Sequence, residues 1–344
     1  MKKLFFFTAA IICVALNHAQ NVATLIHSGE ETPFYGSEAL VQALSSAVDG
    51  DTITLSDGTF TSCDIAKAVT IRGAGADIDN LWEPYAATVL SGTFRIMQPD
   101  STAEKLTIEG IYHDDAIIYT GTLQGCTFSR CRLSSVLSED GHLVDAQFIQ
   151  CRIATYFQLN DNSSVTCMNC VLVDPHGESE ETSYFNVANC VVLVNNDDIG
   201  FLRPGVVQNS ILYDPADYHY VNGEVTEFYN NVAFVEGEFR TAVANTSNRV
   251  VSGLSAVFRT FTTGTYTDTE TFELTSTAQK SYLGTDSTQV GIYGGSYPFV
   301  ATASGDIEEE DSVLVATLIH SGEETPFYGS EALVQALSSA VDGD

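Results

Sequence analysis

The sequence predicts an all-β chain that winds into a stack of coils, with about 20 residues in each coil. The first observation is a two-residue motif that recurs in steps of 20, 19, 20, 20 and 21 residues. The motif stands at Arg130-Cys131, Gln150-Cys151, Asn169-Cys170, Asn189-Cys190, Asn209-Ser210 and Asn230-Asn231. The second observation is that apolar residues alternate on both sides of each motif, which indicates a short strand, a bend and another short strand.

The alternation predicts which side chains face the interior of the stack. A core-type residue precedes the second motif position by three residues, at Phe128, Phe148, Cys167, Val187, Val207 and Phe228. Another follows it by two residues, at Leu133, Ile153, Leu172, Val192, Leu212 and Ala233. We expect each set to form a column that runs through the coils.

The motif itself predicts two structural ladders. At its first position asparagine occurs in four successive units, Asn169, Asn189, Asn209 and Asn230. Asparagine tolerates left-handed backbone, and amides stacked at ~4.8 Å can bond one another. At the second position a column of inward-facing thiols is expected, made of Cys131, Cys151, Cys170 and Cys190. Reduced thiols are favoured there, with disulfides or a metal site at Cys167 and Cys170 as the alternatives.

The entry to the first coil carries a further pattern. It consists of Asp49-Gly50-Asp51, the alternating strand from Thr52 to Leu55, Asp57-Gly58-Thr59 and Thr70-Ile71-Arg72-Gly73. Together with the repeated motif, it resembles the right-handed parallel β-helix family, the pectate-lyase-like solenoids, of a secreted bacterial surface-protein type. The resemblance covers about residues 22–299. A leucine-rich repeat has a similar period, but it needs leucine where this chain has Phe, Val and Cys.

One segment, Ser37 to Val48, has helical periodicity. Ser37 is a suitable N-cap, and Leu40, Val41, Leu44 and Val48 share one face. The first coil of a solenoid would otherwise expose its apolar cross-section and unpaired backbone groups. We therefore expect an N-terminal capping helix.

The chain divides into four predicted parts. Residues 1–19 have the features of a signal peptide, with Lys2 and Lys3, an apolar run over residues 4–16 and cleavage near Ala19. A secreted or cell-surface protein is therefore expected. Residues 20–300 are predicted to form the β-helix domain and residues 301–314 an acidic linker. Residues 315–344 repeat residues 22–51 without a difference, so we interpret them as the truncated start of a second, duplicated domain, with a gene-assembly artefact as the alternative.

The charge of the chain limits its partners. Asp and Glu number 45 against 14 Lys and Arg, which gives a formal net charge of −31. Such a surface repels nucleic acid and anionic lipid. No second long apolar stretch follows the signal, so no membrane span is expected in the mature chain. The partners we expect are other copies of the same domain or surface glycans.

Candidate sites are sparse. The resemblance implies either a lyase that binds calcium or a hydrolase with clustered aspartates. The paired acids that could serve as weak catalytic candidates are Asp114, Asp115, Asp197 and Asp198. They lie in turn-like segments and lack the spacing of the hydrolase family, so a structural role is favoured. Calcium is the one cofactor considered, with Asp174, Glu178 and Glu180 as weak oxygen ligands in one loop.

The leading functional hypothesis is a non-enzymatic surface or secreted β-solenoid module, adhesin-like or structural, from a tandem-repeat protein that assembles head to tail. It rests on the export signal, the duplicated segment and the missing catalytic motifs. The alternatives are a carbohydrate-active enzyme, either a polysaccharide lyase or a glycoside hydrolase, and a glycan-binding module. Fold resemblance alone is weak support for an activity.

Overall fold

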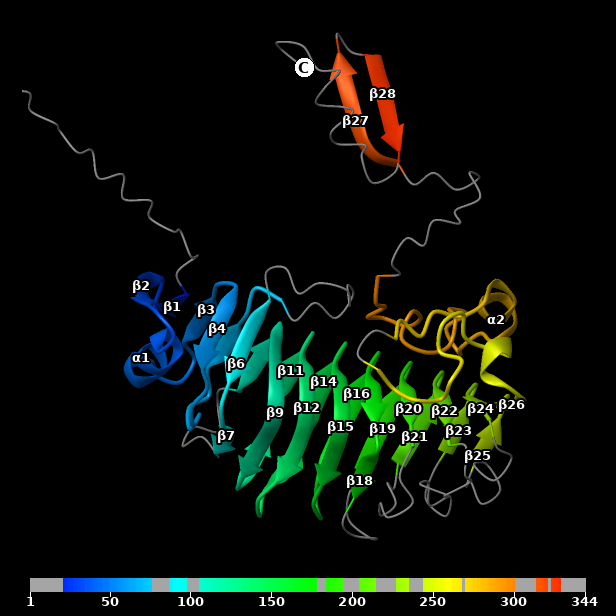
Figure 1. Ribbon diagram of the computed structural model, residues 1–344, viewed down its shortest axis with the longest axis horizontal. Helices are drawn as coiled ribbons and strands as arrows, with labels where there is room; N and C mark the ends of the chain where they lie inside the picture. The colour runs from blue at the N-terminus through cyan, green and yellow to red at the C-terminus, as the bar shows by residue number, and fades with distance from the viewer. Residues whose placement is uncertain are drawn as a thin grey trace, which may run out of the picture. The chain divides into compact units, whose positions relative to one another are not determined.

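The computed structural model describes residues 21–75, 87–97, 105–177, 184–194, 204–214, 227–234, 244–267, 270–300, 314–320 and 323–328. The chain divides into two compact units, Met1–Ala301 and Thr302–Asp344, which are treated separately below. The first unit is a parallel β-solenoid (Figure 1). The predicted fold class, an all-β parallel coil of about 20 residues per turn, is confirmed.

Two long sheets run along the solenoid. The first contains, in hydrogen-bonding order, β2 (Glu30–Tyr35), β1 (Val22–His27), β3 (Thr52–Leu55), β5 (Thr70–Arg72), β8 (Thr107–Glu109), β11 (Thr127–Ser129), β14 (Ala146–Ile149), β16 (Ser164–Met168), β19 (Tyr184–Ala188), β21 (Pro204–Gln208), β23 (Glu227–Tyr229) and β25 (Ala244–Thr246). Apart from β1 and β2, neighbouring strands in this sheet are parallel.

The second sheet carries the other strand of each coil. It contains β4 (Gly58–Thr61), β6 (Thr88–Ser91), β9 (Ile111–Thr120), β12 (Arg132–Ser138), β15 (Arg152–Leu159), β17 (Val171–Val173), β20 (Val191–Leu193), β22 (Ile211–Tyr213), β24 (Val232–Ala233) and β26 (Arg249–Val250), with β7 (Phe94–Met97) on β9 and β18 (Pro175–Gly177) on β15. A short parallel pair lies between the sheets in sequence, β10 (Thr122–Gln124) and β13 (His142–Val144). The helical elements among the described residues of this unit are α1 (Ala39–Ser46), the 3-10 helix η2 (Leu254–Ala256) and α2 (Ser276–Ser281). In the described part of the chain, no helix is long and apolar enough to cross a membrane.

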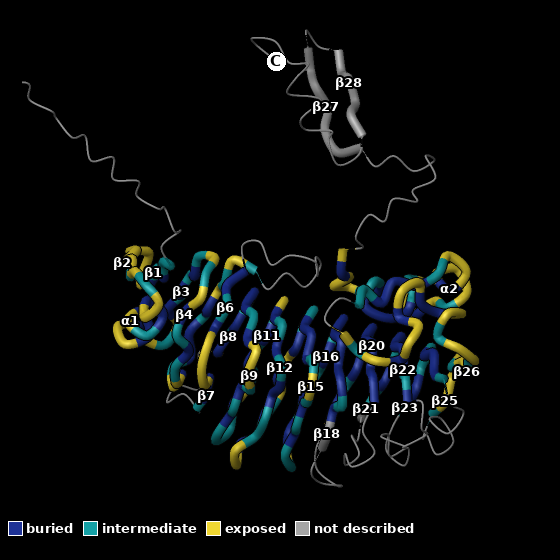
Figure 2. Tube along the Cα trace, in the orientation of Figure 1, coloured by how far each residue is buried: buried dark blue, intermediate teal, exposed yellow. Residues whose placement is uncertain are grey.

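The predicted interior columns are present. Ile108 pairs in register with Phe128, and Phe128 with Phe148, whose rings stack at 4.7 Å between centroids. The same column continues through Cys167, Val187, Val207 and Phe228. The second column, from Leu133 to Ala233, is also buried. Figure 2 shows buried residues along the strands of both sheets, because every second side chain enters the shared core.

The repeated motif forms the bend between the sheets. Its first residue has a left-handed φ in every unit, from 51° at Arg130 to 56° at Asn230. Asparagine recurs there because its short polar side chain makes this conformation less costly. The backbone N–H of Asn169 donates to Ala188 O at 3.0 Å, and the equivalent residues repeat this bond to the next coil.

The second motif residue forms a ladder between coils. The N–H of Cys151 donates to Cys170 Sγ at 3.4 Å, and that of Cys170 to Cys190 Sγ at 3.3 Å. The N–H of Cys190 donates to Ser210 Oγ at 3.0 Å. The thiols therefore accept hydrogen bonds that the backbone would otherwise lack inside the core. All seven cysteines from Cys63 to Cys190 are free thiols, as favoured from the sequence.

The N-terminal cap (residues 21–51) combines a hairpin with a helix. β1 pairs antiparallel with β2 on one side and with β3 on the other, and α1 packs on this hairpin through Leu40, Ala43 and Leu44. The helix is shorter than the predicted range from Ser37 to Val48. Its N-cap is Glu38 rather than Ser37, and Val48 lies beyond its end and is 51% exposed.

A lysine from the first coil closes the end of α1. Lys67 Nζ donates at 2.6 Å to the carbonyls of Leu44 and Ala47. These carbonyls belong to the last turn, where a helix leaves acceptors without intrahelical partners and a cation is favourable.

The segment after β26 does not add coils to the solenoid, although residues 20–300 were predicted to form the β-helix domain. Residues 251–300 fold back along the solenoid, from β26 toward β16 (Figure 1). They cover outward-facing residues of the second sheet, including Val171, Val191 and Ile211, all fully buried. Phe258, Phe261 and Phe272, among others, supply the cover. The solenoid therefore has a second hydrophobic cluster outside its sheet.

The second unit contains a hairpin, β27 (Leu314–His320) and β28 (Glu323–Tyr328). The sequence of Ala316–His320 and Glu323–Tyr328 is identical to that of Ala23–His27 and Glu30–Tyr35. The pairing of these residues matches, since Ala316 faces Phe327 as Ala23 faces Phe34, and His320 faces Glu323 as His27 faces Glu30. The register differs at the first pair, where Leu314 faces Tyr328 and a register shift follows. The duplicated residues thus form the same hairpin as the cap.

Candidate functional site

The candidate catalytic acids do not meet a base in the described structure. Asp114 and Asp115 are exposed on β9, and Asp115 Oδ1 accepts the N–H of Ala116 at 2.8 Å. The neighbouring His113 is fully buried, with Nδ1 3.0 Å from Leu90 O. The imidazole therefore faces the core and cannot exchange protons with the two exposed carboxylates. Asp197 and Asp198 lie outside the described residues.

The calcium hypothesis stays a prediction. Asp174 stands at a bend with φ 43°, and its N–H donates to Leu193 O at 2.8 Å. Glu178 and Glu180, its proposed partners, lie outside the described residues. Within the described ranges, no three His, Cys, Asp or Glu side chains gather as a metal site would require.

The asparagine column holds a C-terminal strap (residues 283–299) against the solenoid. Asn169 Nδ2 donates to Ile292 O at 3.0 Å and to Gly294 O at 2.6 Å. Asn209 Oδ1 accepts the N–H of Thr285 at 2.9 Å. Asn230 Nδ2 donates to Leu283 O at 3.1 Å. Three of the four asparagines thus bind the strap, and the strap runs in the opposite direction to the order of the coils.

This arrangement corrects the predicted amide ladder. The four asparagines do stand at equivalent bends, but the amides of Asn169, Asn209 and Asn230 bond the strap rather than one another. Asn189 Nδ2 is buried without a hydrogen-bond partner. The position was predictable from the repeat, whereas the partners come from residues far along the chain.

The strap region also buries a cation. Arg152 is 1% exposed, and its Nη1 donates to Glu270 O at 2.9 Å. Its guanidinium lies 5.5 Å from the centre of the Phe299 ring. Burial raises the pKa of the Glu270 carboxyl, while the nearby Arg152 charge acts in the opposite direction. Arg152, on β15 of the solenoid, therefore contacts two residues of the covering segment (residues 251–300) through its guanidinium.

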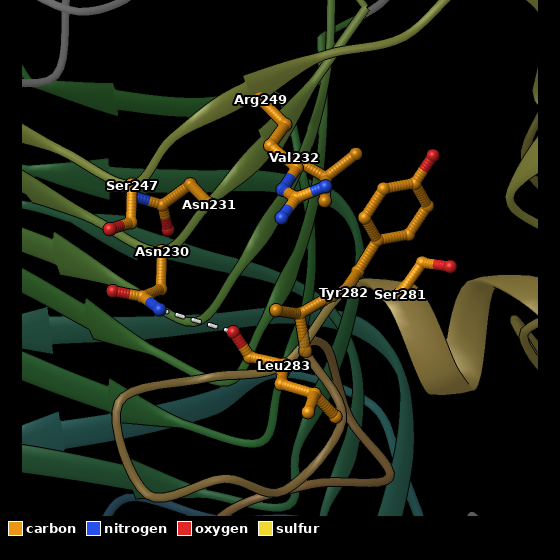
Figure 3. A pocket seen from close by; sticks show the side chains of 9 residues that line it. Asn230, Asn231, Val232, Ser247, Arg249, Ser281, Tyr282 and Leu283 are labelled. Atoms are coloured by element: carbon orange, nitrogen blue, oxygen red, sulfur yellow. Dashed lines mark hydrogen bonds between the residues drawn. The ribbon is translucent and has the colours of Figure 1, made fainter.

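A small pocket lies where the last coils meet the beginning of the strap (Figure 3). Its volume is about 230 Å³. It is lined by Asn230, Asn231, Val232, Ser247, Arg249, Ser281, Tyr282, Leu283 and Val290. The coil residues come from β24, β26 and the bends before them, whereas the others come from the end of α2 and the strap. The covering segment therefore completes this pocket.

Arg249 provides the charge of the pocket. Its guanidinium faces the ring of Tyr282, 5.9 Å from the ring centre, as Figure 3 shows. Arg72, Arg95 and Arg259 each form an ion pair, with Glu109, Glu139 and Glu273. No carboxylate among the described residues forms such a pair with Arg249.

Sequence reasoning missed this pocket because its residues are spread over some sixty positions. One signal was present, since Ser247-Asn248 stands at the motif position after Asn230-Asn231, with φ 59° at Ser247 and Arg249 in register with Val232. The N–H of Asn231 donates to Asn248 Oδ1 at 2.8 Å, which extends the ladder by one coil.

Comparisons with protein-family models, curated proteins and solved structures find no match for this chain. The fold is therefore established by the strand pairing described above. A fold alone does not specify an activity, so function has to be argued from the site and from the duplicated segment.

Proposed function

We propose that this chain is a non-enzymatic β-solenoid module of a secreted or cell-surface protein, structural or adhesin-like, whose units join head to tail through duplicated caps. The observation that carries the proposal is the second hairpin. From Ala316 to His320 and from Glu323 to Phe327, β27 and β28 share the sequence and register of β1 and β2, although they lie at the other end of the chain. Other copies of the domain are thus the proposed partners.

The edges of the cap support this assembly. The exposed strand β2 contains Glu30, Glu31 and Pro33, and its only partner in the described structure is β1. Charged residues and proline on an edge strand oppose further pairing. The other edge of the hairpin, on β1, pairs with β3 of the first coil.

The copy of the cap (residues 315–344) has the same sequence, so β27 provides the edge that corresponds to the β3-pairing edge of β1. In the described residues, β27 pairs only with β28, so the edge that corresponds to the β1–β3 contact has no described partner. A strand of the β3 type from another unit would complete it. Such a contact is heterologous and does not close on itself, so strings of units follow.

One observation at the candidate acids supports a non-enzymatic module. Among the described residues, the histidine next to the exposed Asp114 and Asp115 is His113, which is enclosed in the core. Acid–base chemistry needs both groups within reach of one substrate. Surface glycans remain the alternative partners, and a glycan array on the mature domain would detect them.

The proposal is tested by comparing the mature chain with one that ends at Val300. The copy and the resident cap compete for the same β3 edge, so we expect slow association that increases after incubation in mild denaturant. Light scattering coupled to size-exclusion chromatography reports the mass. The full chain should form higher-mass species, and the shortened chain should stay monomeric.

A matched control keeps the length of the full chain. Leu25 is 5% exposed in the cap, and Leu318 is its counterpart in the copy. Leu318→Asp would place a charge in the apolar contact and should abolish association. Equal mass distributions for the full and shortened chains would refute the assembly role.

A further inference from the structure

The pocket beside Arg249 has one cationic hydrogen-bond donor group among its lining residues, the guanidinium of Arg249. Asn230 Nδ2 is committed to Leu283 O, and Asn231 Nδ2 donates to Val207 O and Asn248 Oδ1. The guanidinium of Arg249 is held by a ring and by no carboxylate among the described residues. Ser247 and Ser281 also line the cavity. A planar guanidinium suits an oxyanion, because it can donate two parallel hydrogen bonds.

The net charge selects among oxyanions. The chain carries −31 formal charges, so its field opposes an approaching anion in proportion to the charge of that anion. A dianion such as phosphate or sulfate is disfavoured more than a monoanion. A single carboxylate satisfies the guanidinium at the lowest electrostatic cost.

The remaining walls set the size and character of the ligand. Val232, Leu283 and Val290 line the pocket with apolar groups. The volume, about 230 Å³, lies below the ~300–1,000 Å³ of pockets for drug-sized ligands. A carboxylate with a short apolar group therefore fits both the donors and the space.

We propose that this pocket binds small monocarboxylates, with the carboxylate on Arg249 and a short apolar group against Leu283 and Val290. Tyr282 holds the guanidinium in place through its ring face. The site requires the last coil and the covering segment together, so it belongs to the folded first unit and does not depend on the duplicated hairpin.

Saturation-transfer NMR on the chain ending at Val300 tests the proposal, with butyrate as the probe and butyramide as its neutral isostere. Butyrate should bind saturably, and butyramide should bind at least about tenfold more weakly, because it cannot form the charged bidentate contact. Arg249→Gln should raise the butyrate Kd by at least about tenfold. Arg249 is exposed, so this variant should keep the fold, which circular dichroism would verify.

The control variant is Arg72→Gln, which removes an exposed arginine paired with Glu109 at a distant coil and should leave butyrate binding unchanged. No saturable butyrate signal, equal binding by butyramide, or full binding by Arg249→Gln would each overturn the proposal. Tighter binding of inorganic phosphate than of butyrate would overturn the assignment to monocarboxylates. These outcomes are separate from the assembly test, because the shortened chain lacks residues 315–344.

Discussion

Asn169 and Asn189 occupy equivalent bends, yet replacing them with glycine should have very different effects. Both side chains are buried, and their φ angles are 53° and 54°. Glycine adopts this backbone freely, so neither variant introduces strain. Asn169→Gly removes two hydrogen bonds to the strap, whereas Asn189→Gly removes an amide whose Nδ2 has no partner.

The structure gives the size of the difference. Each hydrogen bond contributes ~1 kcal/mol net, so the two bonds of Asn169 stabilise the strap by ~2 kcal/mol more than the amide of Asn189 does. The entropy cost of glycine in the unfolded chain is common to both variants and cancels. Since ~1.4 kcal/mol is a factor of ten, strap opening should be ~30-fold more frequent in Asn169→Gly than in Asn189→Gly.

Hydrogen exchange followed by mass spectrometry on peptides from residues 283–299 measures this opening. A stack of coils need not unfold in one step, so a local probe is more informative than a global denaturation curve. The strap should exchange faster in Asn169→Gly, while peptides from β11 and β14 stay protected. Equal strap exchange in the two variants would refute the role given to the asparagine column.

Three further predictions follow from the described contacts. Lys67→Met should destabilise α1 by ~1–2 kcal/mol, because two carbonyls of its last turn lose a charged donor, and exchange of α1 amides would show it. Cys170→Ser should be tolerated better than Cys170→Val by ~1–3 kcal/mol in thermal unfolding, since valine leaves the N–H of Cys151 without an acceptor. Burial raises the pKa of the Cys126 thiol from 9.0 to about 12. The contribution of the buried neutral thiol to the free energy of unfolding is therefore complete below pH 9 and is lost as the pH rises toward 12. Urea midpoints of Cys126→Ala should therefore fall less steeply over this range than those of the parent chain.

The repeat made most of the solenoid predictable. Period and alternation placed Phe128, Phe148, Leu133 and Ile153 inside, and the structure confirms them. The signal was strong because each coil repeats the same physical requirement, an apolar interior and a left-handed bend. The left-handed φ at each motif follows from the same repetition.

The covering segment was not predicted, although one local signal pointed to it. β17 and β20 read as continuous apolar runs, with Val171, Leu172 and Val173 all buried. Continuous apolar strands indicate burial on both faces of a sheet. What covers them could not be read from the repeat, because the segment around Phe258 and Phe272 has its own irregular sequence and meets the solenoid through contacts distant along the chain.

The interchangeability of the two caps is tested most directly by deleting residues 21–51, which removes β1 and leaves β5 as the other partner of β3. If residues 315–344 can replace the cap, the chain without residues 21–51 should pair them with β3 of its own or another copy. The β3 amides of this variant should then stay protected from hydrogen exchange. A chain lacking both segments should lose that protection and expose the apolar end of the first coil. Equally fast exchange of β3 in the two chains would contradict the proposal that the duplicated segment caps a solenoid.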